Sequence, residues 1–160
     1  MVENYLRLTG FYHVSRIGLI RGFYPLLAAL VEKWRPETHL FVLPVGEDTV
    51  TLEDVTHIFS LPIDGEPVSE WTDSSNKSTA YAHTKYLPFL RDFERIHTYS
   101  WGSACLAHLY RALCHASRYD TKEMDGPLNL LFVWAWERLP CIALVPRQSL
   151  PPAEIPVAMR

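Results

Sequence analysis

Two cysteines and two histidines of the kind that bind zinc lie close together in the chain: Cys105, His108, Cys114 and His115. The surrounding residues predict one continuous helix, on which successive side chains are rotated by about 100°. Cys105 and Cys114 are nine residues apart and therefore point about half a turn away from each other. One helix cannot direct both thiolates at one metal ion, so we expect no metal site here.

A carboxylate–histidine arrangement occurs in a second, shorter helix, where Glu53 and Asp54 precede His57. The three side chains fall within one turn, as in an acid–base pair. Acidic residues in the first turn also stabilise a helix, because they interact favourably with its dipole. This structural role accounts for both carboxylates without catalysis, and we favour it. His57 is then an ordinary surface or half-buried histidine.

The sequence lacks the short motifs by which several enzyme classes bind phosphate, metal or an acyl group. It contains no glycine-rich phosphate loop, no G-x-S-x-G, no H-E-x-x-H and no paired C-x-x-C. Its seven glycines are never clustered. We therefore predict that the chain is not an enzyme and has no catalytic residues, no cofactor and no small-molecule substrate.

Charge is distributed unevenly along the 160 residues, whose net charge is −3. Residues 41–75 contain eight acidic residues and no Lys or Arg. Such a stretch is either a solvated surface or a face that meets a basic partner. In the second case, the candidate interaction surface consists of Glu47, Asp48, Glu53, Asp54, Asp64 and Glu66.

Basic side chains form the alternative candidate surface. The helix predicted at 101–116 has one apolar face, and the opposite face carries His108, Arg111, His115 and Arg118. Such a face either contacts phosphates, without sequence specificity, or is simply solvated. The candidate nucleic-acid contacts are Arg91, Arg95, Arg111 and Arg118.

The pattern of apolar residues, prolines and turn residues predicts a mainly α, compact helical domain with one small β-hairpin at about residues 39–52. A short helix is expected to open at a Thr51–Asp54 capping box and to run through Ser60. Longer helices are expected at 25–34, 87–97, 101–116 and 127–138. The hairpin strands are expected at 39–43 and 49–52 around a turn at 44–48, with a short strand at 66–68 and a polar loop at 69–84 further on.

We expect residues 1–140 to form one domain and residues 141–160 to form an extended tail. From residue 140 onward there are five prolines in 21 residues, which argues against a packed element. No stretch has the apolar length of a signal peptide or a membrane helix. The three cysteines cannot all pair with one another, and reduced thiols are typical of a cytosolic or nuclear protein.

Tryptophan is unusually frequent for a chain of this length, with five residues. Trp34, Trp101, Trp134 and Trp136 are expected to form a large aromatic core. An aromatic cage for a methylated ligand is the alternative, but it needs a convergence of rings that spacing does not show. The charged pair Glu137–Arg138 ends the last helix either at water or in an interaction groove, and both interpretations stay open.

Several segments, taken in order, resemble the plant mobile domain. This family is carried by plant retroelements and DNA transposons and by the nuclear maintenance-of-meristems and main-like proteins. The resemblance covers most of residues 8–140. Its most distinctive strings are WRPETH at 34–39, TLEDV at 51–55, WGSA at 101–104 and WAWER at 134–138, and LPIDGEPV at 61–68 also matches.

The chain departs from the family pattern in two places. The family usually has a longer helical insert between the LPIDG segment and the helix before WGSA, where this chain has the polar loop at 69–84. The family domain also continues beyond WAWER with more helices. We therefore expect an N-terminal portion or a shortened copy of the domain.

The resemblance implies a non-enzymatic nuclear protein with a role in transposon silencing, gene-expression regulation, and meristem and genome maintenance. It also implies a protein partner, which for some members is a serine/threonine phosphatase 7-like protein. The alternative is a transposase-derived nucleic-acid-binding domain. The family is often labelled aminotransferase-like, but a pyridoxal-phosphate enzyme needs a lysine held in a preorganised pocket. The four lysines here lie at predicted helix ends or in polar loops.

Overall fold

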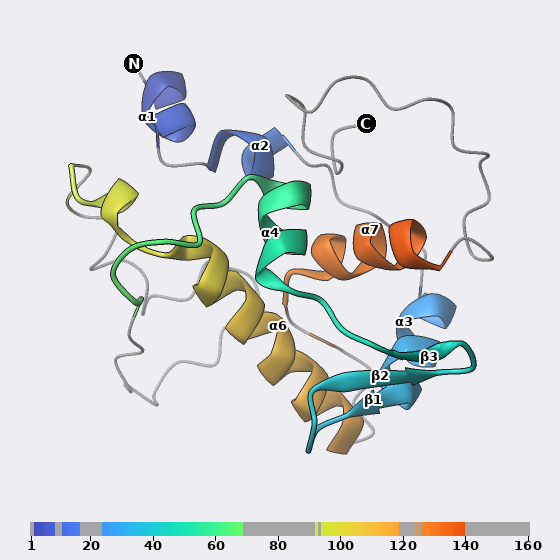
Figure 1. Cartoon of the computed structure of the whole chain (residues 1–160). Helices are drawn as coiled ribbons and strands as arrows, with labels where there is room; N and C mark the ends of the chain where they lie inside the picture. Colours follow the sequence, from blue (N-terminus) through green and yellow to red (C-terminus); the bar gives the residue numbers. More distant parts are fainter. Residues whose placement is uncertain are drawn as a thin grey trace.

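The computed structural model describes residues 2–8, 11–16, 24–68, 92, 94–118, 124 and 126–139. They form a mainly helical fold with one small antiparallel sheet, which confirms the predicted fold class (Figure 1). The first helices are α1 (Val2–Leu8), α2 (Phe11–Arg16) and α3 (Tyr24–Lys33). The sheet consists of β1 (Trp34–Arg35), β2 (Leu40–Leu43) and β3 (Gly46–Asp48). The remaining elements are α4 (Leu52–Phe59), the 3-10 helix η2 (Ile96–Thr98), α6 (Trp101–Arg118) and α7 (Leu128–Arg138).

Helix α3 confirms the helix expected at 25–34, shifted by one residue at each end. Its inner side packs against the core through buried Leu30 and half-buried Leu26, Leu27 and Val31. The helix ends at Lys33 because Pro36 disfavours a helical conformation for the residue before it. The next two residues form β1, a strand too short to leave a pattern in the sequence.

The hairpin is present, but its second strand lies earlier in the chain than expected. Leu43 pairs with Gly46, so the turn contains only Pro44 and Val45. The strand expected at 49–52 and the turn expected at 44–48 are therefore wrong, since residues 46–48 already pair with β2. Gly46 has a φ of +134°, which is easy only for glycine and allows this early reversal.

Helix α4 confirms the predicted capping box. The Thr51 hydroxyl accepts a hydrogen bond from the Asp54 N–H at 3.3 Å, and the Asp54 carboxylate accepts one from the Thr51 N–H at 2.8 Å. The helix ends at Ser60, whose φ of 56° is left-handed. Its buried face consists of Val55, Ile58 and Phe59.

The strand expected at 66–68 is reduced to a single bridge between Glu66 and Tyr99. The Glu66 N–H donates to the Thr98 carbonyl at 2.8 Å, and its own carbonyl accepts from the Ser100 N–H at 2.9 Å. The helix expected at 87–97 is wrong at its described end, where residues 94–95 form a turn and Ile96–Thr98 form the 3-10 helix η2. Residues 87–91 and 93 lie outside the described residues. The loop expected at 69–84 and the tail expected at 141–160 also fall outside them.

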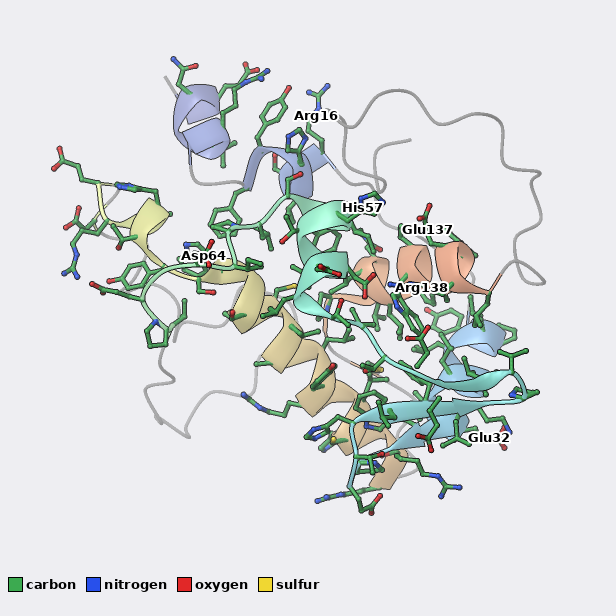
Figure 2. All side chains as sticks on the ribbon, viewed as in Figure 1. Arg16, Glu32, His57, Asp64, Glu137 and Arg138 are labelled. Carbon is green, nitrogen blue, oxygen red and sulfur yellow. The ribbon has the colours of Figure 1, made fainter. Side chains whose placement is uncertain are left out.

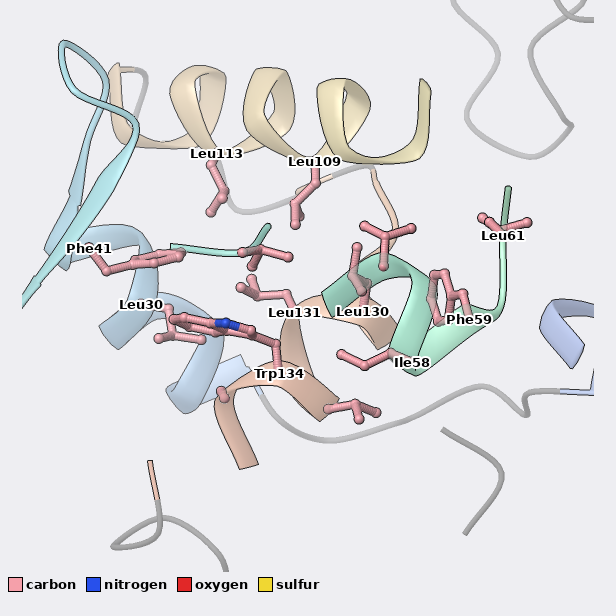
Figure 3. Close-up of a cluster of buried hydrophobic side chains, with 14 of the residues drawn as sticks. Leu30, Phe41, Ile58, Phe59, Leu61, Leu109, Leu113, Leu130, Leu131 and Trp134 are labelled. Atoms are coloured by element: carbon pink, nitrogen blue, oxygen red, sulfur yellow. The ribbon is translucent and has the colours of Figure 1, made fainter. Parts of the chain in front are cut away.

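Helices α6 and α7 confirm the helices expected at 101–116 and 127–138. Residues 130–135 of α7 are all buried, as expected for a central helix that is apolar on every side. Figure 3 shows side chains of α3, β2, α4, α6 and α7 meeting in one cluster around Leu131 and Trp134. Within the described part of the chain, every helix is too short or too polar to cross a bilayer.

The tryptophans occupy the core, as predicted, but in two groups. Phe41 lies between Trp34 and Trp134, with ring centroids 4.8 and 5.2 Å away. Trp101 packs separately against Phe11, at 5.1 Å. Because Trp34, Trp101 and Trp134 are all buried, they have no open ring face for a methylated ligand. Half-buried Trp136 completes the set at the edge of the core.

Candidate functional site

The acidic residues of the hairpin lie at the surface, on β3. Glu47 is exposed, and Asp48 is half-buried with its Oδ1 accepting a hydrogen bond from the Thr49 N–H at 2.8 Å. Glu53, in the first turn of α4, is also exposed. These three carboxylates come from adjoining segments at the junction of the sheet and α4. They form one candidate interaction surface.

Asp54 belongs to the fold and not to that surface. It is only 8% exposed, and its two oxygens accept hydrogen bonds from the Thr51 N–H, the Thr51 hydroxyl and Arg138 at 2.8, 2.8 and 3.0 Å. The capping box turns the carboxylate inward, where the C-terminal end of α7 supplies a guanidinium. A carboxylate engaged in this way is unavailable to a partner, which corrects its place in the expected surface.

The charged end of α7 docks on α4 (Figure 2). The hydrogen bond and charge of Asp54 raise the pKa of Arg138 above its ordinary value, and the charges of Asp48 and Glu137 act in the same direction. The Arg138 side chain is still 49% exposed. Glu137 lies 3.8 Å from His57. The Glu137–Arg138 pair therefore joins two helices, instead of ending α7 freely in water.

The last two residues of the expected acidic surface lie elsewhere. Asp64 and Glu66 belong to the loop that follows α4, and both are exposed. Figure 2 shows Asp64 on the opposite side of α4 from Arg138. Glu66 forms an ion pair with Arg95 at 3.3 Å, and both side chains are mostly exposed, so the pair adds little stability. The acidic stretch thus splits into two separate groups.

The basic candidates are also separated. Arg91 lies outside the described residues, and Arg95 is paired with Glu66 before α6 begins. Arg111 and Arg118 are both exposed on α6, seven residues apart. Two turns of helix place them on the same face, about 10 Å apart along the axis. Of the three candidate arginines that the structure describes, Arg111 and Arg118 share a surface and Arg95 lies apart from them.

The cysteines of α6 have separate environments. Burial raises the pKa of Cys105 to about 12, so its thiol stays protonated and is a poor nucleophile or metal ligand. The sulfur of Cys114 accepts a hydrogen bond from the Trp34 indole at 3.4 Å. Among the residues that the structure describes, no three His, Cys, Asp or Glu side chains come together as a metal site.

The family model of the plant mobile domain matches residues 10–84 and 75–158 of the chain. The chain belongs to the plant mobile domain family. Three relatives come from Arabidopsis thaliana. A serine/threonine-protein phosphatase 7 long form homolog is 36% identical over 192 residues, which cover 81% of this chain and 14% of the relative. Protein MAIN-LIKE 1 is 29% identical over 202 residues, which cover 85% of this chain and 40% of the relative. Protein MAINTENANCE OF MERISTEMS is 28% identical over 193 residues, which cover 81% of this chain and 40% of the relative. No solved structure matches the chain.

This plant mobile domain spans less than half the length of these relatives. Each alignment is longer than the 160 residues of the chain, so the relatives contain residues that this chain lacks. The two segments of the family match overlap at residues 75–84. That position lies within the loop where the sequence predicts a shortened insert.

Two exposed residues of this plant mobile domain were missed by the sequence reasoning. Val45 and Tyr24 are large apolar side chains that remain in water. The signal for Val45 was available, because a residue placed in a turn is generally at the surface. The signal for Tyr24 was its position directly before Pro25, at the start of a helix.

Proposed function

We propose that this plant mobile domain is a non-enzymatic protein-interaction module of the plant nucleus. Its role would lie in transposon silencing, gene-expression regulation, and meristem and genome maintenance. The chain is related to the MAIN and MAIN-LIKE proteins, and one relative carries the name of a phosphatase 7 long form. We accordingly propose a serine/threonine phosphatase 7-like protein as the partner.

The observation that supports this proposal most strongly is that two potentially reactive side chains, Asp54 and Cys105, are engaged in the fold. Asp54 is occupied by Thr51 and Arg138, and burial keeps the Cys105 thiol protonated. A general base or nucleophile must instead have a pKa suited to its task and an open approach. These two groups serve the fold, and the exposed carboxylates and apolar residues are what a partner can reach.

The experiment is quantitative co-purification of the tagged full chain from plant nuclei. We expect a serine/threonine phosphatase to co-purify in a fixed ratio with the chain. The matched variants are Glu47→Lys on β3 and Asp64→Lys on the loop after α4, which make the same kind of charge reversal in the two acidic groups. Recovery of the chain without a stable partner would contradict the proposal.

A nucleic-acid-binding domain is the second candidate, favoured by one observation. Arg111 and Arg118 are both exposed on a single face of α6. Two phosphate contacts predict that the logarithm of the binding constant for duplex DNA falls with the logarithm of salt concentration with a slope of about −2. The double variant Arg111→Gln, Arg118→Gln should abolish this slope, whereas Arg95→Gln should leave it unchanged. A flat dependence for the wild type at low salt rejects this function.

A further inference from the structure

Two arginines converge on Tyr12 in the N-terminal helices. Tyr12 belongs to α2, and the guanidinium carbon of Arg7, in α1, lies 4.1 Å from the centroid of its ring. The guanidinium carbon of Arg16, one turn further along α2, lies 5.9 Å from the same centroid. One arginine over an aromatic ring is an ordinary surface contact, but two of them concentrate positive charge around a single tyrosine.

The packing of α2 determines which side of the helix carries Tyr12. Phe11 and Val14 pack against the core, and the Phe11 ring meets the Trp101 ring at 5.1 Å. Because successive helical side chains are rotated by about 100°, residues 12 and 16 lie together on nearly the opposite side of α2. Figure 2 shows Arg16 pointing away from α4 and the core. Tyr12 and Arg16 therefore share the outward side of the helix.

A carboxylate already contacts one of the two arginines. Glu3, four residues before Arg7 in α1, forms an ion pair with it at 3.1 Å. Both side chains of this pair are more than half exposed, so the pair is weak and Arg7 is able to change partner. The hydrogen bond to Glu3 raises the pKa of Arg7 above its ordinary value, and Tyr12 acts in the same direction. The Arg7 guanidinium is therefore already close to the Tyr12 hydroxyl.

A phosphate group on the Tyr12 hydroxyl would meet both arginines. Such a group carries a charge of about −1.5 to −2 at neutral pH and three strong acceptor oxygens. A guanidinium presents its N–H donors in a fork that matches those oxygens, and charge-assisted bonds of this kind are short and strong. The phosphate attracts Arg7 more strongly than the single charge of Glu3 does. It would therefore bind Arg7 of α1 and Arg16 of α2 together.

The two N-terminal helices are able to open and admit a modifying enzyme. α1 has seven residues and α2 has six, and α2 contains no fully buried residue. Helices this short have little stability of their own, and local opening of such segments costs little free energy. Tyr12 is itself only half-buried. A kinase that binds its substrate as an extended chain can therefore reach the Tyr12 hydroxyl.

We propose that Tyr12 is a phosphorylation site and that Arg7 and Arg16 hold the resulting phosphate. A tyrosine-directed kinase supplies the group from a nucleoside triphosphate. The bond from the terminal phosphorus to its bridging oxygen breaks, and a bond from Tyr12 Oη to that phosphorus forms. The nucleoside diphosphate leaves, and the hydroxyl proton passes to the kinase or to water. The phosphate then joins α1 to α2, and this inference does not depend on the proposed partner.

The first experiment tests the modification. The full chain is incubated with an extract of plant cells and ATP, and mass spectrometry locates phosphotyrosine. We expect a phosphate at Tyr12 and none at this position in Tyr12→Phe. Absence of phosphate from Tyr12 in the wild-type chain would overturn the proposed site.

The second experiment tests the role of the arginines. The full chain is prepared with phosphotyrosine at position 12, and amide hydrogen exchange of residues 2–8 is compared with that of the unmodified chain. We expect exchange about tenfold slower in the phosphorylated chain, because α1 is then tied to α2. The double variant Arg7→Gln, Arg16→Gln should abolish this protection. Arg95→Gln is the matched control and should leave it unchanged, since Arg95 lies 6.0 Å from the ring of a different tyrosine, Tyr99.

Two outcomes of the exchange experiment would overturn the role of the arginines. One is equal exchange with and without the phosphate, and the other is protection that persists in the double variant. The unmodified chain in millimolar inorganic phosphate is the remaining comparison, and its exchange should stay as fast as without phosphate. Equal protection by free phosphate would overturn the proposal, because Arg7 and Arg16 would then bind an anion from solution.

Discussion

Asp54 shows how one side chain combines a local and a distant role. Its partner Thr51 is three residues away, and the S/T-x-x-D pattern predicts their contact from sequence alone. Its partner Arg138 is 84 residues further along the chain, and no local sequence pattern predicts that contact. The capping role was therefore predictable, whereas the burial that removes Asp54 from the acidic surface was not.

Replacing Asp54 by alanine should lower the free energy of unfolding by about 2–3 kcal/mol, because the helix cap and a charge-assisted hydrogen bond are lost together. Arg138 is half-exposed and can return to water, which limits the loss. Urea unfolding of the full chain measures the change. Glu53→Ala is the matched control, since Glu53 is exposed in the same helical turn and should change stability by less than about 0.5 kcal/mol. Equal midpoints for the two variants would contradict the assigned role of Asp54.

The half-buried Cys105 thiol predicts a loss of stability at alkaline pH. Its pKa of about 12 in the folded state lies above the value of 9.0 for a free thiol, so between these values the unfolded chain loses the proton while the folded chain keeps it. Unfolding is then favoured as pH rises, by up to about 1.4 kcal/mol per pH unit. Urea unfolding between pH 8 and pH 11 should show a steeper decline for wild type than for Cys105→Ala. Tyrosines and the other thiols titrate alike in both proteins, so their effect cancels when the stability of Cys105→Ala is subtracted from that of the wild type. If the free energies of unfolding of the two proteins fall in parallel with pH, the prediction is refuted.

At the scale of elements, local signals determine where helices begin and end but not how strands pair. Pro36 and the capping box at Thr51 placed the boundaries of α3 and α4 to within one residue. The hairpin register was missed because it depends on which two residues turn, and Gly46 allows an earlier turn than the strand propensity of residues 49–52 suggests. Propensity describes a single strand, whereas register is a property of a pair.

Gly65 and Gly46 provide a matched test of how closely the loop after α4 approaches η2. Both have positive φ, and a Cβ at Gly46 would meet nothing within 4 Å, whereas one at Gly65 would collide with the carbonyl oxygen of Thr98. Gly46→Ala should therefore cost about 1–2 kcal/mol from backbone strain alone. Gly65→Ala should cost a further 1–3 kcal/mol, because the loop must move away from Thr98. Thermal unfolding of both variants measures the difference, and an equal loss would mean that the loop does not pack against η2.

At the scale of the whole molecule, nearness in sequence was a poor guide to nearness in space. The acidic stretch 41–75 is continuous in sequence, yet Glu47 lies on β3, before α4, Asp64 lies in the loop after α4, and Asp54 is buried. Arg111 and Arg118 share a face because helical periodicity relates them, and that relation was visible in the sequence. The packing of α3 against β2 is a tertiary contact, which no periodicity encodes.

One tryptophan from each group of the core allows the contribution of packing to stability to be separated from that of hydrogen bonding. Trp134, where α7 meets the sheet, is fully buried, and its indole N–H has no hydrogen-bond partner in the described part of the chain. The Trp101 indole donates to the Ile96 carbonyl at 2.7 Å. Phenylalanine at either position removes a similar volume, but only Trp134→Phe also removes an unsatisfied polar group. We expect Trp134→Phe to change the free energy of unfolding by less than about 1 kcal/mol and Trp101→Phe to lower it by about 2 kcal/mol more. Urea unfolding followed by circular dichroism measures the free energy of unfolding of both variants. Because both replacements remove the same volume, an equal loss of stability would mean that the Trp134 N–H does donate a hydrogen bond.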